Sequence, residues 1–73
     1  MENLDELKQN HKTSFFAYEY ERLLKQKEEV SLMMTDESMI DMAKEEMNLL
    51  DAQLQGIKDK IDAIIKEDEY ADQ

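Results

Sequence analysis

The sequence predicts an all-α protein that folds as a long antiparallel helical hairpin resembling a two-stranded coiled coil. Its 73 residues include no Pro and one Gly, 38% of them are charged, and aliphatic residues recur at helical spacing. A chain of this size forms one small domain, in which a single core supplies only about 3–5 kcal/mol of stability. We therefore expect one helical domain over residues 1–73, supported by a partner or by a longer parent chain.

The stretch from Ile40 to Ile64 carries the strongest helical pattern. Counted in alternating steps of three and four, every position is apolar, which is the a and d pattern of a coiled-coil helix. Gly56 lies off this apolar seam, at a c position, so it weakens the helix by about 1 kcal/mol without opening the core. The seam residues are Ile40, Ala43, Met47, Leu50, Leu54, Ile57, Ile61 and Ile64.

A first helix is expected over about residues 3–34. Its apolar pattern lapses at residues 10–14, where Thr13 or Ser14 offers a cap for a new helix. Because neither Pro nor Gly forces a break there, we expect the helix to continue. A break would instead produce a three-helix arrangement.

The second half of this helix has a wider and less regular apolar face. Lys27 occupies one seam position, where its methylene groups can lie along the seam while its ammonium reaches water, so we assign it a structural role. Four of the five aromatic residues lie between positions 15 and 20, and we expect them to pack in the core. The seam residues are Phe16, Tyr20, Leu23, Val30 and Met34, with Leu24 and Met33 beside them.

A turn is predicted at residues 35–38, because Thr, Asp and Ser side chains accept hydrogen bonds from free helix amides. The second helix then covers about residues 37–67, and an acidic tail at 68–73 frays. Both helices are about 45 Å long, so their seams match along an antiparallel hairpin. Two such hairpins can also pair into a four-helix bundle.

The charge limits the classes of partner. A formal net charge of −10, from 19 acidic and 9 basic residues, repels phosphates, so we expect no direct binding to nucleic acid. No apolar run approaches the length of about 20 residues that spans a bilayer, and no export signal is evident. We expect a cytoplasmic protein that binds a protein partner. Its negative charge either keeps the chain soluble or attracts a basic surface on that partner.

Chemical motifs are lacking in the sequence. There is no Cys, His11 is the only histidine, and no Glu stands three residues before it as a di-metal site requires. Neighbouring acidic residues diverge by about 100° around a helix, which prevents them from converging on a metal or a substrate. We expect no enzyme activity, no cofactor and no metal.

Methionines gather around the predicted turn. Thioether side chains are adaptable, so they fill irregular cores well and also line docking surfaces. The sequence leaves both roles open, and the candidate partner-binding residues are Met33, Met34, Met39 and Met42.

The stretch MMTDESMIDMAKEEMNLL, residues 33–50, resembles the amino-terminal helical domain of bacterial class I peptide chain release factors, particularly those of the release factor 1 type. In that family a long helix ends at an apolar pair, an acidic turn follows, and the next helix opens with Met-x-x-Met-Ala-x-Glu-Glu. Here the opening runs from Met39 to Met47. The likeness extends more weakly over residues 15–65.

The resemblance implies a noncatalytic accessory domain that contacts the ribosomal stalk base in translation termination. The chain lacks the Pro of the family's turn and the Gly-Gly-Gln loop that promotes peptidyl-tRNA hydrolysis, so the resemblance implies no termination activity by this domain alone. The alternative function is a self-associating coiled-coil scaffold or adaptor unrelated to translation, with a homodimer as its working form.

Overall fold

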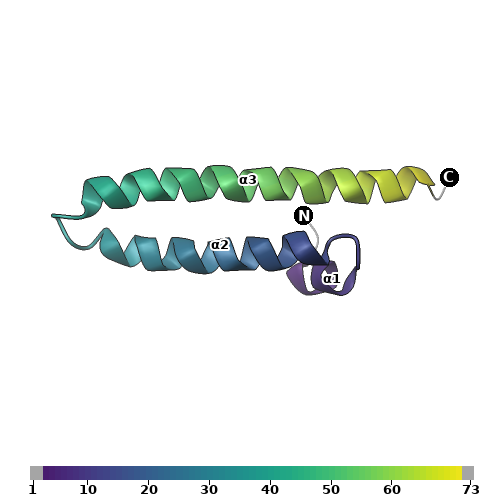
Figure 1. Cartoon of the computed structure of the whole chain (residues 1–73), viewed down its shortest axis with the longest axis horizontal. Coiled ribbons are helices and arrows are strands. Elements are labelled where there is room, and N and C mark those ends of the chain that lie inside the picture. The colour runs from purple at the N-terminus through teal and green to yellow at the C-terminus, as the bar shows by residue number, and fades with distance from the viewer. Residues whose placement is uncertain (1–2, 72–73) are drawn as a thin grey trace.

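The computed structural model describes the backbone of residues 3–71 and the side chains of residues 3–68. Three helices form, α1 at Leu4–Gln9, α2 at Ser14–Met33 and α3 at Ile40–Ala71. Helices α2 and α3 run antiparallel, and α1 folds against the start of α2 (Figure 1). The protein is therefore an all-α hairpin with a short third helix, a rod with dimensions of 55 × 18 × 14 Å.

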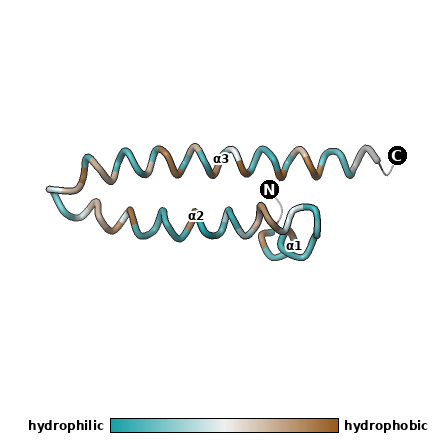
Figure 2. The backbone as a smooth tube through the Cα atoms, viewed as in Figure 1, coloured by the Kyte–Doolittle hydropathy of each residue, from teal (hydrophilic) through white to brown (hydrophobic). Residues whose placement is uncertain are grey.

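The α3 seam is confirmed by burial. In Figure 2, hydrophobic segments recur along α3 and hydrophilic segments separate them. Four of the eight predicted seam residues are buried, namely Ala43, Leu50, Leu54 and Ile61. The other four, Ile40, Met47, Ile57 and Ile64, are half-buried.

Two hydrophobic clusters fill the space between the helices. Leu23 of α2 packs with Leu50 and Leu54 of α3 in the middle of the hairpin. Nearer the termini, Leu7 of α1 packs with Ala17 and Ile61. Ile57 contacts both clusters, so the core is continuous along the hairpin.

The first helix does not continue through residues 10–14, contrary to our expectation. Asn10 takes an extended backbone conformation (φ −84°, ψ 119°), and its side-chain oxygen accepts a hydrogen bond from the Lys12 amide at 2.9 Å. A polar side chain thereby offers the backbone an alternative to the helical ladder. Thr13 is fully buried and donates its hydroxyl hydrogen to the Leu7 carbonyl at 2.7 Å, which closes the corner between α1 and α2.

The connection at the distal end is slightly longer than predicted. Helix α2 ends at Met33, and α3 begins at Ile40 rather than near residue 37. The carboxylate of Asp36 accepts hydrogen bonds from the amide and hydroxyl of Ser38, at 3.0 and 2.8 Å. These bonds stabilise a turn before the helix begins.

The other end of α3 also differs from the prediction. The helix continues to Ala71, past the predicted end at residue 67, so residues 68–71 belong to the helix. Lys12 holds this segment through an ion pair with Asp68 at 2.5 Å. The rest of the predicted frayed tail, residues 72–73, lies outside the described residues.

Candidate protein-docking surfaces

The distal end of the hairpin concentrates negative charge. We call residues 28–51 the distal tip; they hold eight acidic residues and one basic residue, a net charge of −7. The remaining 49 residues together carry only −3. Because helix α2 ends and α3 begins here, most of the charge lies at one end of the rod (Figure 1).

The four predicted partner-binding methionines divide between core and surface. Met33, Met34 and Met39 are half-buried around the connection. Met42 has 65% of its surface exposed. The structure therefore assigns partial packing to three of them and leaves Met42 as the methionine most available to a partner.

Two leucines that sequence reasoning did not single out are also exposed at the distal tip. Leu32 of α2 is 72% exposed and Leu49 of α3 is 60% exposed. Both lie off the seam, and Leu49 follows Met42 by one heptad. An inspection of the non-seam heptad positions finds them, because most residues at those positions are polar or charged.

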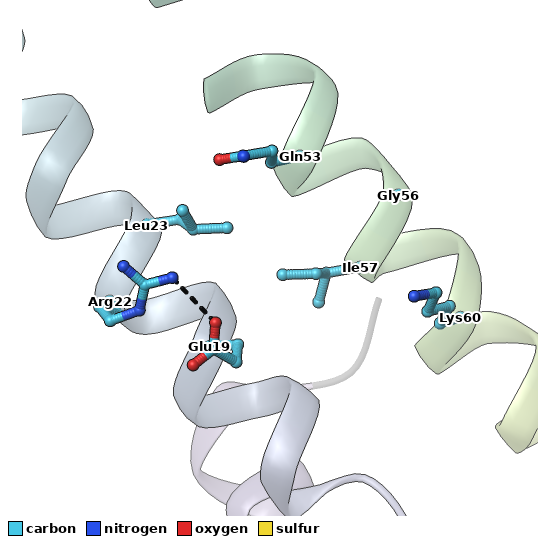
Figure 3. A pocket seen from close by; sticks show the side chains of 7 residues that line it. All are labelled: Glu19, Arg22, Leu23, Gln53, Gly56, Ile57 and Lys60. Carbon is cyan, nitrogen blue, oxygen red and sulfur yellow. Dashed lines mark hydrogen bonds and ion pairs between the residues drawn. The ribbon is translucent and has the colours of Figure 1, made fainter. Parts of the chain in front are cut away.

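One flank of the hairpin is open near its middle. Side chains of α2 and α3 line a groove of about 370 Å³, in which Leu23 and Ile57 point toward one another (Figure 3). Gly56 leaves open space at its edge, since an added Cβ atom would meet no atom within 4 Å. The other lining residues are Glu19, Arg22, Gln53 and Lys60.

The cations beside this groove already have partners. Arg22 pairs with Glu19 at 2.9 Å on the same helix, as the dashed line in Figure 3 marks. The Lys60 ammonium lies 5.7 Å from the centre of the Phe16 ring, within cation–π range. The groove therefore offers an apolar floor with a partly neutralised rim.

The opposite flank is bridged by an ion pair. Lys27, the lysine at the seam position, pairs its ammonium with Asp51 of α3 at 2.7 Å. This contact supports the structural role of Lys27. The sequence did not identify Asp51 as its partner. A smaller groove of about 310 Å³ lies beside this pair, with Tyr20, Leu24 and Leu54 in its lining. Its α3 rim carries the polar side chains of Gln55 and Lys58, whereas Gly56 stands at the rim of the first groove.

At the opposite end of the rod, α1 is tied to α2 by an ion pair. The Lys8 ammonium contacts the Glu21 carboxylate, and both side chains are partly buried. The hydrogen bond between the Lys8 ammonium and the Glu21 carboxylate lowers the pKa of Glu21 and raises the pKa of Lys8. Lys8 also lies 5.3 Å from the centre of the Tyr18 ring.

The aromatic residues of α2 are only partly in the core. Phe16 and Tyr20 are half-buried as expected, but Phe15 and Tyr18 are 69% and 60% exposed. Phe15 meets Phe16 edge-on, with ring centres 5.5 Å apart. The expected aromatic packing is therefore wrong for Phe15 and Tyr18, because both lie off the apolar seam that Phe16, Tyr20 and Leu23 form on α2.

His11 is exposed in the corner between α1 and α2. Among the described residues, no group of three or more His, Cys, Asp or Glu could hold a metal ion. No described helix is both long and apolar enough to cross a membrane.

Comparisons with known protein families, with curated proteins and with solved structures found no match for this chain.

Proposed function

We propose that this protein is a noncatalytic helical module that binds another protein through its distal tip. One observation carries the proposal: a net charge of −7 and three exposed aliphatic side chains, Leu32, Met42 and Leu49, lie at the same end of the rod. Acidic residues attract a basic partner over distance, and apolar side chains supply affinity once water is excluded. The partner is therefore a protein with a basic and partly apolar surface.

The resemblance of residues 33–50 to release-factor domains supplies a context for this proposal. In that context the partner is a basic protein of the ribosomal stalk base, and the module contributes contacts during translation termination. The acidic tip supports this proposal because it suits a basic protein surface and disfavours direct contact with ribosomal RNA.

Cosedimentation with large ribosomal subunits tests this function. We expect saturable binding that weakens when Leu32 and Met42 are both changed to Gln, because those two side chains lose their apolar contact. The matched control changes Phe15 and Ala52, exposed residues outside the tip, to Gln. The ribosomal proposal is wrong if the chain fails to bind at low salt, or if both double variants bind as well as the parent.

A second candidate function, the self-associating scaffold, is favoured by Phe15 and Tyr18. These exposed aromatics lie in residues 1–27, which contain five acidic and five basic residues and so do not repel a second copy by net charge. Sedimentation equilibrium over a concentration series tests it. A dimer that dissociates on Tyr18→Glu supports the scaffold, whereas a monomer at high micromolar concentration rejects it.

A further inference from the structure

We infer that the open flank of the hairpin is the docking site for one amphipathic helix of a partner protein, whose basic end lies over the distal tip. The inference deepens the proposed role as a protein-binding module and rests on it, but it does not depend on the ribosomal context. A bound helix would lie beside α2 and α3 and complete a three-helix bundle.

The first argument is a row of uncharged residues along α3. Met42, Leu49, Gly56 and Ala63 are spaced by seven residues, so they lie on one flank with a drift of only about 20° per heptad. All four are exposed. The row spans about 32 Å, the length of a helix of about 20 residues.

The second argument is the groove that opens beside this row. Gly56 belongs both to the row and to the lining of the groove, whose floor contains Leu23 and Ile57 (Figure 3). With no Cβ at Gly56, a partner backbone can approach α3 closely at the middle of the row. A helix whose apolar face follows the row would place its central side chains in the groove.

The third argument is charge, which fixes the occupant and its direction. Glu29 lies one heptad after Arg22 and Glu46 one heptad before Gln53, so heptad spacing puts both in the distal half of the groove's flank. The middle of this flank carries the pair of Arg22 and Glu19, together with Lys60. A helix with Lys or Arg at one end is therefore attracted to the distal half, and its other end is uncharged or acidic. A second copy of this chain fits less well, because it would add another net charge of −10.

The test uses a labelled synthetic helix of about 20 residues, with Leu along one face and Lys confined to its last two turns. Fluorescence anisotropy measures its affinity for the full chain. Leu49→Glu is expected to weaken binding about tenfold or more, because it removes an exposed leucine from the site. Gln55→Glu adds the same charge on the opposite flank, where Gln55 lines a separate groove with Lys27 and Asp51, and it is expected to change affinity less than about twofold.

A second variant separates binding from folding. Gly56→Gln places a neutral side chain in the groove while replacing glycine with a better helix former, so binding is expected to fall while thermal stability rises. A peptide of the same composition with its apolar face scrambled is expected to bind about tenfold more weakly. These two results distinguish groove docking from nonspecific attraction to an acidic chain.

The inference is overturned if the parent chain does not bind the helix, or if Leu49→Glu and Gln55→Glu weaken helix binding equally. A dimer of the parent chain that Leu49→Glu dissolves would also overturn it, because the occupant would then be a second copy. In each case, saturable ribosome binding that is sensitive to Leu32 and Met42 would leave the proposed function standing. If the chain binds the synthetic helix but does not bind ribosomes, only the ribosomal context is rejected.

Discussion

At the residue scale, the corner between α1 and α2 depends on a few polar atoms. The side-chain oxygen of Asn10 accepts a hydrogen bond from the Lys12 amide. The fully buried hydroxyl of Thr13 donates a hydrogen bond to the Leu7 carbonyl. Buried polar groups of this kind cost free energy when their partner is removed. The corner is therefore sensitive to single-atom changes.

Thr13→Val is expected to reduce the free energy of unfolding by about 1–3 kcal/mol, because it leaves the Leu7 carbonyl without this donor. Thr13→Ser keeps the hydroxyl and is expected to lose less. Urea unfolding followed by circular dichroism measures both variants. A larger loss for Ser than for Val would show that the methyl group, which Val keeps and Ser lacks, matters more than the hydrogen bond at this position.

Substitution of Gly56 is expected to stabilise the protein, in contrast to substitution of Thr13. Gly56→Ala is expected to raise the free energy of unfolding by about 0.5–1 kcal/mol, because alanine loses less conformational entropy in a helix. The added Cβ atom meets no atom within 4 Å, so no steric cost opposes this gain. The same urea experiment measures it, and a destabilised variant would contradict the open space at this position.

Several residue-level contacts were beyond sequence reasoning. The seam position of Lys27 was evident from periodicity, but its partner Asp51 lies on the other helix, and its identity depends on how the two helices align. Asn10 was recognised as polar, yet its extended backbone follows from a local competition that periodicity does not describe.

At the scale of elements, α3 was the most predictable and α1 the least. A seam of eight apolar positions specifies a helix and its buried face, whatever lies opposite. Six residues, in contrast, are too few for a helix to persist alone in water. Helix α1 depends on tertiary contacts, which a sequence pattern reveals poorly.

A buried leucine and an ion pair are among those contacts. Leu7 is almost fully buried against Ala17 and Ile61, and Lys8 pairs with Glu21. Since the pKa of Glu21 is lowered by Lys8, ionisation of Glu21 stabilises the docked helix at pH values above the ordinary glutamate pKa. Because the pKa of Lys8 is raised, protonated Lys8 stabilises the docked helix fully at pH values below the ordinary lysine pKa. This stabilisation is lost as the pH rises through the raised pKa.

Docking of α1 is therefore expected to be strongest between about pH 4.3 and 10.4, the ordinary glutamate and lysine pKa values. As pH falls below this range, through the lowered pKa of Glu21, α1 loosens from α2. The NMR signals of the Leu7 methyl groups report this change. Glu21→Gln removes the acidic step, and an unchanged acid titration in that variant would assign the step to another carboxyl group.

At the scale of the whole molecule, stability depends on one thin core. Two clusters joined through Ile57 run along a rod only 18 × 14 Å in cross-section, so few residues are fully covered. A single domain of this size has about 3–5 kcal/mol to lose. The fold class could be predicted from the composition and the apolar seam alone. The exposed surfaces could not, because periodicity does not identify which residues lie beside the seam in the folded hairpin.

Core truncations are expected to affect the whole rod. Ile61→Ala and Leu50→Ala each remove a buried side chain at a cost of about 2–5 kcal/mol, comparable to the total stability. Either variant is expected to be largely unfolded at 25 °C by circular dichroism. Leu32→Ala, at a 72% exposed position, serves as the control and is expected to change stability by less than about 0.5 kcal/mol.

The uneven charge of the rod has a consequence for how it meets a partner. The distal tip has a net charge of −7 and the remaining residues have a net charge of −3, so the molecule is an electric dipole along its 55 Å axis. The field of a basic surface exerts a torque on such a dipole and turns its acidic end forward before contact. Salt that shortens the screening length from about 10 Å to 3 Å removes this orientation, so partner capture slows even where the final contact is apolar.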